Sequence, residues 1–156
     1  MSAPHWLLWG FLATLALTTL LALGQGLKLT RMNLPFVLGS LFTSNRDRAR
    51  ALGFFVHLAM GLAFALLYVA IFQAWGPGWL HGALLGVAHA SVVLVVVLPM
   101  LPGVHPRMAS EQAGPTAKRQ LEPPGFLAMH YGRRTPISML VTHVIYGAIL
   151  GAFYHP

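Results

Sequence analysis

Four stretches of this chain contain no Asp, Glu, Lys or Arg, and each is long enough to cross the hydrocarbon core of a membrane. A transmembrane helix needs about 20 predominantly apolar residues, and its backbone groups must all be hydrogen-bonded within the segment. We therefore predict an all-α membrane protein, a bundle of four transmembrane helices that forms one membrane domain over residues 1–156. The spans are expected at residues 6–24, 51–74, 79–99 and 137–154.

The charged residues predict the orientation of these spans. All ten Lys and Arg residues lie in two long loops, at 25–50 and 100–136, and the short turn at 75–80 carries none. Two spans separate the loops, so both lie on one side of the membrane. Basic loops remain in the cytoplasm, and we therefore expect both termini outside. The net charge of +7 then reflects membrane orientation, and we expect no nucleic-acid partner.

The loops themselves carry structural signals. Residues 32–42 are apolar but too short to span, and Pro35 suits the first turn of a short helix. We predict an interfacial segment that lies among the headgroups or folds back under the bundle. Pro99 and Pro102 predict that the third span ends there. The loop at 100–136 is long and rich in proline, and loops of this length are commonly ordered or functional.

One pattern of His, Gly and Tyr occurs twice with the same spacing. The copies are His57, Gly61 and Tyr68, and His143, Gly147 and Tyr154. Each copy follows a basic cluster in a loop, which predicts a duplicated helix hairpin. The two halves would be parallel repeats, because each half begins on the same side of the membrane. Chance similarity between apolar helices is the alternative explanation.

Three histidines, His57, His89 and His143, fall at similar depth in three different spans. At 1.5 Å per helical residue they lie about 10–15 Å from the cytoplasmic boundary. Ionisable side chains at such depth are costly, and they usually face the bundle interior or a hydrated cavity. We therefore take these three residues as the candidate site.

Three interpretations of the histidines remain open. They could bind a transition metal or haem, with Met60 and Met139 as additional sulfur ligands. They could instead form hydrogen bonds between helices. They could also line a pocket for a lipid or quinone headgroup that enters from the cytoplasmic leaflet. Loop residues would then close the mouth of that pocket and meet phosphate or carbonyl oxygens: His105, Arg107, Arg133 and Arg134.

The composition favours a protein without catalytic activity. The chain has no cysteine, and its three acidic residues all lie in the loops. An acid–base enzyme would need Glu111 or Glu122 beside a loop histidine, and nothing in the sequence brings them together. We expect a small accessory or assembly-type component of the membrane. The alternative is a ligand-binding protein built on the three histidines.

Small residues recur at four-residue spacing on the predicted helices, as at Gly10, Thr14 and Thr18. Such stripes allow membrane helices to approach closely. We therefore expect a homo-oligomer or a subunit of a larger membrane complex, with the lipid bilayer as the other partner.

Three loop segments resemble those of a group of bacterial four-span membrane proteins with no established activity. They are TRMNLPFVLGSLFT at 30–43, HPRMASE at 105–111 and RQLEPPGFLA at 119–128. The resemblance covers nearly the whole chain. It implies a location in the bacterial inner membrane, and it supplies no site residues.

Overall fold

Four long helical segments form the body of the molecule. The computed structural model describes residues 3–155, and within them it contains no β-strand beyond one isolated bridge between Met108 and Leu121. All four segments are long and apolar enough to cross a membrane, which confirms the predicted fold class. They are α1 (Ala3–Gly26), α3 (Arg46–Trp75), the run of α4 (Trp79–Val92), η1 (Val93–Val97) and α5 (Leu98–Val104), and α6 (Thr135–Phe153).

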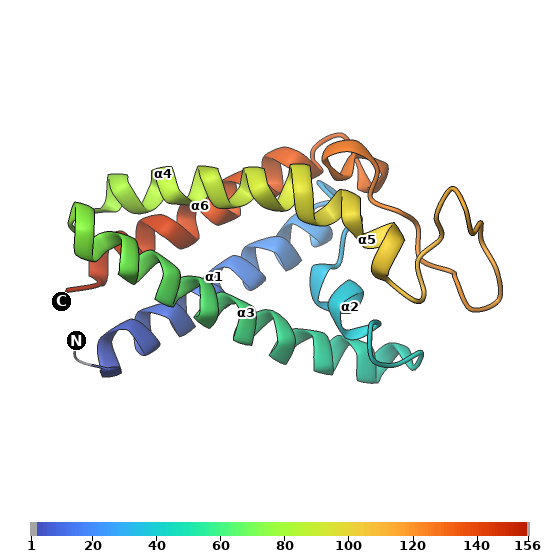
Figure 1. Cartoon of the computed structure of the whole chain (residues 1–156), viewed down its shortest axis with the longest axis horizontal. Coiled ribbons are helices and arrows are strands. Elements are labelled where there is room, and N and C mark those ends of the chain that lie inside the picture. Colours follow the sequence, from blue (N-terminus) through green and yellow to red (C-terminus); the bar gives the residue numbers. More distant parts are fainter. Residues whose placement is uncertain (1–2, 156) are drawn as a thin grey trace.

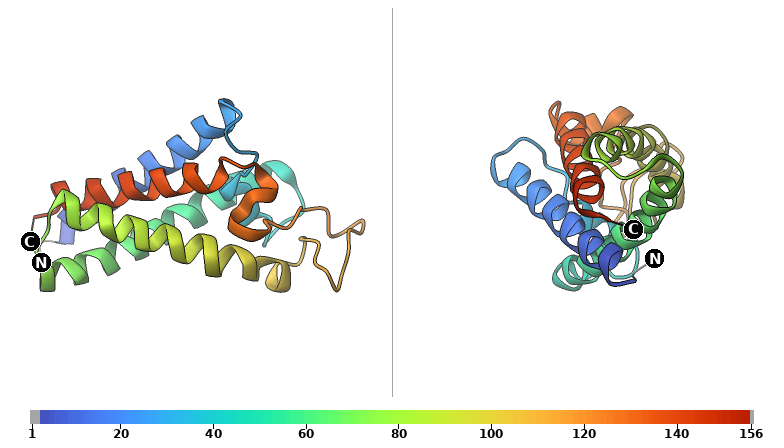
Figure 2. Two further views of the ribbon diagram at one scale, coloured as in Figure 1. Left: turned by 90° about the horizontal axis from the view of Figure 1, so that it is seen from above. Right: turned by 90° about the vertical axis from the view of Figure 1, so that its left-hand side faces the viewer.

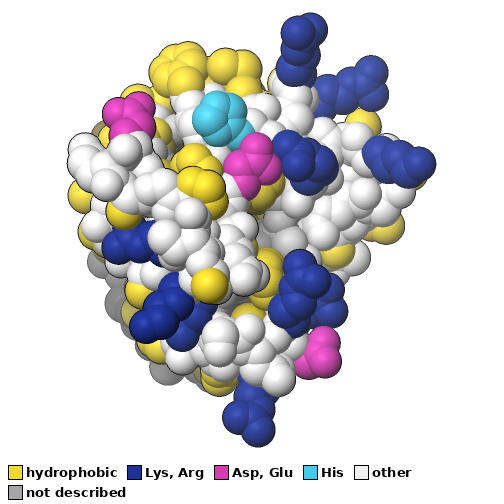
Figure 3. All heavy atoms as spheres, turned by 90° about the vertical axis from the view of Figure 1, so that its right-hand side faces the viewer, with side chains coloured by type: hydrophobic (Ala, Val, Ile, Leu, Met, Phe, Trp, Pro, Cys, Tyr) yellow, Lys and Arg dark blue, Asp and Glu magenta, His cyan; other side chains and the backbone are white. Residues whose placement is uncertain are grey.

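The start of α1 and the end of α6 lie at one end of the bundle, and the long loops lie at the other (Figure 1). At the loop end, Lys and Arg side chains are spread over the surface and around its edge, and few acidic side chains lie among them (Figure 3). The molecule is therefore polarised along the helix axes, as the positions of the charges in the sequence predict.

The helix α3 begins at Arg46, five residues before the predicted start of the span. Asn45 caps it, because the Asn45 side chain accepts a hydrogen bond from the Arg48 N–H at 2.9 Å. Asp47 in the first turn adds a favourable interaction with the helix dipole. The basic cluster is therefore the first turn of a transmembrane helix, and only its apolar part resembles a span in the sequence.

The predicted end of the third span at Pro99 is wrong, because the helix continues to Val104. Directly before Pro99 the chain makes a π-helical turn over Val93–Val97, in which the Leu98 N–H bonds to the Val93 carbonyl. The wider turn places Pro99 in the first turn of the following segment, α5. The helix therefore continues through Pro99 and also contains Pro102 inside α5.

The short helix predicted around Pro35 is present as α2 (Leu34–Gly39). Asn33 caps it by accepting the Phe36 N–H at 2.9 Å. The helix packs against the N-terminal end of α3 at two glycines. A Cβ atom on Gly39 would overlap the Ala49 backbone, and one on Gly53 would overlap the Pro35 carbonyl. The segment is therefore folded back under the bundle, between the diverging α3 and α5 (Figure 1).

Among the four long segments, the closest backbone contact joins α4 to α6. A Cβ atom on Gly82 would overlap the Gly147 carbonyl, and one on Gly86 would overlap the His143 carbonyl. Gly10 of α1 meets α3 in the corresponding way, since its Cβ would lie 2.7 Å from the Ala65 Cβ. Each half of the chain thus contains one helix contact at glycine, and α1 also lies beside α6 of the other half (Figure 2). This arrangement is what a duplicated hairpin predicts, and the duplication itself stays a prediction.

The long loop between α5 and α6 is held against the first loop. The Arg31 N–H donates to the Tyr131 carbonyl at 2.7 Å. The Tyr131 hydroxyl in turn donates to the Glu122 carbonyl at 2.6 Å. Tyr131 ends the short 3-10 segment η2 (Phe126–Tyr131), which lies directly before α6. These contacts order the loop end of the bundle.

Candidate functional site

The three intramembrane histidines line one cavity of about 100 Å³. His57 comes from α3, His89 from α4 and His143 from α6. The rest of the lining is almost entirely apolar, and it includes Leu34 and Leu38 of α2. The cavity lies where α3 diverges from the α4–α5 run, with α2 closing it toward the loops.

His89 and His143 are in direct contact. Their ring centroids lie 4.7 Å apart, and the ring planes are at 83°. Phe64 stacks on His89 with a centroid separation of 3.9 Å. The His89 Nδ1 atom also lies 3.4 Å from the Tyr68 hydroxyl, a long hydrogen bond between α4 and α3. His89 is therefore fixed mainly by packing.

The hydrogen bonds of His57 and His143 assign their tautomers. His143 Nδ1 lies 2.7 Å from the Met139 carbonyl, which can only accept, so Nδ1 carries the proton. Thr18 donates its hydroxyl proton to the Thr14 carbonyl, and its oxygen therefore accepts from His57 Nδ1 at 3.0 Å. In the neutral form of both rings, Nε2 is then a hydrogen-bond acceptor.

The surroundings of the cavity favour the neutral form of the imidazoles. No Asp or Glu is among the described residues that line the cavity. A buried cation without an anionic partner is costly, and the cost is high at membrane depth. The cavity therefore presents two lone pairs, on His57 and His143, within an apolar lining. Such a site suits a ligand that donates hydrogen bonds.

The geometry gives little support to a shared metal site. Within residues 3–155, no three His, Asp or Glu side chains lie close enough together to hold one ion. Met139 is buried and uses its carbonyl to fix His143. Met60 lines the cavity but is 38% exposed on the outside of the bundle. A haem macrocycle is much larger than the cavity. The metal and haem interpretation stays a prediction.

The structure supports in part the second interpretation, in which the histidines form hydrogen bonds between helices. His57 bonds to Thr18 of α1, and His89 makes its long contact to Tyr68 of α3. His143 bonds only within its own helix, at Met139. The imidazoles therefore have structural partners on one side and face a cavity on the other.

His105 of the predicted loop set is a buried structural residue, 2% exposed. Its Nε2 donates to the Val37 carbonyl at 3.0 Å, and its Nδ1 accepts the Arg107 N–H at 3.1 Å. These bonds attach the start of the long loop to α2. Burial lowers the pKa of His105, and the positive charge of Arg107 contributes in the same direction.

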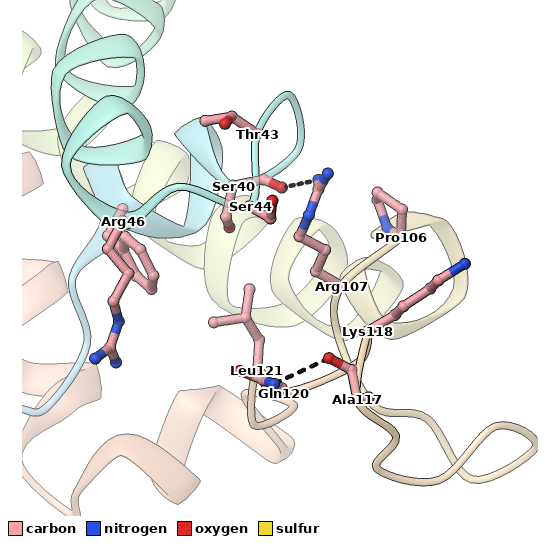
Figure 4. Close-up of a pocket in the computed structure, with 11 residues that line it drawn as sticks. Ser40, Thr43, Ser44, Arg46, Pro106, Arg107, Ala117, Lys118, Gln120 and Leu121 are labelled. Carbon is pink, nitrogen blue, oxygen red and sulfur yellow. Dashed lines mark hydrogen bonds between the residues drawn. The ribbon is translucent and has the colours of Figure 1, made fainter.

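The structure separates the three loop arginines that the sequence predicted at one mouth. Arg107 lines an open cleft of about 880 Å³ beneath α2, together with Arg46 and Lys118 (Figure 4). Arg134 lines a different, apolar groove between α1 and α6. Arg133 lines neither of these hollows nor the imidazole cavity.

Several lining residues of these sites were not predicted from the sequence. Phe64 and Tyr146 of the imidazole cavity resemble ordinary core residues. Arg46 and Lys118 of the cleft resemble solvated charges, and they lie about 70 positions apart in the chain. Their proximity depends on the attachment of the long loop to α2 through His105.

Fold and cavities together define a membrane protein of four long apolar helical segments, with three histidines around a mainly apolar cavity inside the bundle. Comparison of the chain with protein-family models, with curated proteins and with solved structures gave no match.

Proposed function

We propose that this protein binds the uncharged, hydroxyl-bearing head of a lipid in the imidazole cavity. The observation that carries the proposal is the pair of fixed imidazoles. In His57 and His143 the Nδ1 atom is bonded to the protein, so that Nε2 remains for a ligand. Two acceptors in an apolar cavity match a ligand with hydroxyl donors and no charge.

The size of the cavity limits the head to a compact group. Its volume is about 100 Å³, whereas sites for drug-sized ligands measure about 300–1,000 Å³. Met60 of α3 and Val97 of η1 line the cavity and are also exposed on the surface of the bundle. The lipid chain would therefore leave between these two helices and lie in the bilayer.

A role in binding agrees with the expected accessory function, because it needs no catalytic group. We infer a bacterial inner-membrane location from the resemblance of the loops. We place the basic end in the cytoplasm, since positively charged loops are retained there. The cavity then opens to the cytoplasmic leaflet, and both termini lie outside.

Cysteine labelling tests this orientation, and the natural chain contains no cysteine to interfere. Gln112→Cys lies in the exposed long loop, and His155→Cys lies exposed beyond α6. A membrane-impermeant maleimide added to intact cells should label position 155 and leave position 112 unlabelled until the cells are opened. The reverse pattern would place the basic end outside.

Analysis of bound lipid tests the proposed ligand. An Asn side chain places its amide nitrogen near the position of histidine Nδ1 and has no counterpart of Nε2. His57→Asn and His143→Asn therefore keep the bonds to Thr18 and Met139 but remove the acceptors. We expect mass spectrometry to find a hydroxylated neutral lipid in the purified protein and a loss of at least tenfold in the double variant.

The matched control is Phe55→Leu, because Phe55 lies two residues from His57 on the exposed face of α3. Its bound lipid should equal that of the unchanged protein. A lipid content that is the same in all three proteins would show that no specific lipid depends on the imidazoles.

A further inference from the structure

A second hollow lies beside α2 and shares no lining residue with the imidazole cavity. It is an open cleft of about 880 Å³ between the α2–α3 connection and the long loop. Ser40, Thr43, Ser44 and Arg46 form one wall, and Arg107 and Lys118 form part of the other (Figure 4). The walls come from segments far apart in the sequence, so the folded loop end creates the cleft.

The charges around the cleft are all of one sign. Arg46, Arg107 and Lys118 line it, and no acidic residue is found among the described lining residues. Two acids are next to lining residues in the sequence, and one of them, Asp47, pairs with Arg50 at 3.4 Å. Glu122 pairs instead with Arg31, at 3.3 Å. Three cations in a concave surface create a local positive potential that attracts anions.

Arg107 is held in place by the protein. Its Nη1 atom donates to the carbonyl oxygens of Ser40 and Leu41, at 2.5 and 3.3 Å. Its backbone N–H is fixed by His105, which is itself bonded to α2. Among the described residues no partner bonds to Arg107 Nε or Nη2, so this edge of the guanidinium remains for a ligand. Such an edge suits two oxygens of one phosphate.

The start of α3 adds to the positive potential. Arg46 is the first residue of this 30-residue helix and lines the cleft. The Asn45 side chain bonds the Arg48 N–H, which leaves the earlier N–H groups of the first turn without a helical partner. Helix N-termini favour anions because of these groups and the helix dipole.

We propose that the cleft binds a phosphate group, either on a soluble molecule or on the head of an anionic phospholipid. The guanidinium of Arg107 and the hydroxyl groups of Thr43 and Ser44 would supply directed hydrogen bonds. Arg46 and Lys118 would supply charge. Within the described chain, neither of these two side chains has a hydrogen-bond or ion-pair partner. This site does not depend on the imidazole cavity, because the two hollows share no lining residue.

The alternative is that these cations serve only to orient the spans. That explanation makes no distinction between cleft residues and other basic residues at the same end. The binding proposal makes this distinction, because Arg48 and Arg133 carry the same charge as the cleft residues but lie outside the cleft lining. Variants at 46 and 118 can therefore be compared with variants at 48 and 133, each removing one positive charge.

The experiment measures phosphate binding to the full chain in two arms. In detergent, inorganic phosphate is titrated and followed by calorimetry. In nanodiscs of phosphatidylcholine, phosphatidic acid is added and its enrichment around the protein is measured. Binding in the first arm assigns a soluble anion, and binding in the second arm alone assigns a lipid headgroup. Either result supports the site.

Arg46→Gln, Lys118→Gln and Arg107→Gln should each weaken binding at least fivefold. Arg48→Gln and Arg133→Gln should leave it within twofold. The Arg46 and Lys118 variants keep the test valid if Arg107→Gln disturbs the loop. Equal weakening by all five variants, or no binding in either arm, would overturn the proposal.

Discussion

The imidazole rings of His89 and His143 meet edge to face, with centroids 4.7 Å apart. The contact joins α4 to α6 within the membrane span, close to the glycines where the two backbones touch. Phe64 stacks on His89, so this ring is enclosed by aromatic neighbours. The three histidines therefore divide into one packing residue and two residues with a nitrogen available to a ligand.

This division predicts the effect of replacing His89 by Phe. A phenyl ring can retain both aromatic contacts, which are worth about 0.5–1.5 kcal/mol each beyond their buried area. His89→Phe should therefore keep the unfolding midpoint in mixed detergent micelles and the amount of bound lipid within twofold. A loss of lipid equal to that of the Asn variants at 57 and 143 would assign His89 to the ligand instead.

The glycine contact between α4 and α6 predicts a strong dependence on side-chain size. Gly82→Ala places a methyl group against the Gly147 backbone, which cannot move aside as a side chain can. We expect the free energy of unfolding to fall by about 3 kcal/mol, the upper part of the range for overpacking.

Gly103→Ala is the matched control for this substitution. Gly103 lies in α5, and a Cβ atom there would meet nothing within 4 Å. Denaturant titration of the three proteins in the same micelles should show a lower midpoint only for Gly82→Ala. Equal midpoints would mean that the helices are not in backbone contact.

His105 predicts that the attachment of the long loop to α2 depends on pH. Burial lowers the pKa of His105 in the folded chain below its usual value of 6.5. The unfolded chain therefore binds more protons as the pH falls below about 6.5. The stabilising contribution of neutral His105 is complete above that pH and is lost progressively below it.

Hydrogen exchange of the α2 backbone should detect this loss. Exchange at Val37–Ser40 should accelerate between pH 6.5 and 4.5, after correction for the intrinsic pH dependence of exchange. His105→Gln cannot be protonated, and its corrected rates should not change over the same range. Identical pH profiles for the two proteins would contradict the role of His105.

Glu122 makes two contacts, and the loss of each should destabilise the protein by a different amount. Its carbonyl accepts the Tyr131 hydroxyl at 2.6 Å, and burial is the main cause that raises the pKa of Tyr131 to about 12. The phenol therefore stays a donor at physiological pH. Tyr131→Phe should lower the free energy of unfolding by about 1 kcal/mol. Glu122→Gln removes only the exposed ion pair with Arg31 and should cost less than about 0.5 kcal/mol. Denaturant titration compares the two variants, and the opposite order would contradict this assignment.

The sequence predicts the spans well because membrane solvation imposes a strong local rule. A long apolar segment without charge satisfies its backbone groups in a bilayer by forming a helix. The caps at Asn33 and Asn45 were not predicted, although they depend only on short-range hydrogen bonding. Pro99 was misjudged because its effect depends on the π-helical turn that precedes it. That turn cannot be read from the residue types alone.

The sites are less predictable than the spans. Counting residues from the membrane boundary places His57, His89 and His143 at one level, and the structure places them around one cavity. Which nitrogen faces that cavity depends on the neighbours of each ring, such as Thr18 and Met139. The cleft lined by Arg46 and Lys118 depends on the fold of a long loop. Sequence spacing across that loop gives no distance between the two residues.

The most direct test of the proposed function compares two lipids that differ in their hydrogen-bond donors. 1-Monooleoylglycerol carries two hydroxyl groups, and methyl oleate has the same chain and carries none. Native mass spectrometry of the purified protein should show at least tenfold tighter binding of the monoacylglycerol. That preference should disappear in the double variant His57→Asn, His143→Asn. Equal binding of the two lipids, or a preference that survives in the double variant, would contradict a site built on the imidazole acceptors.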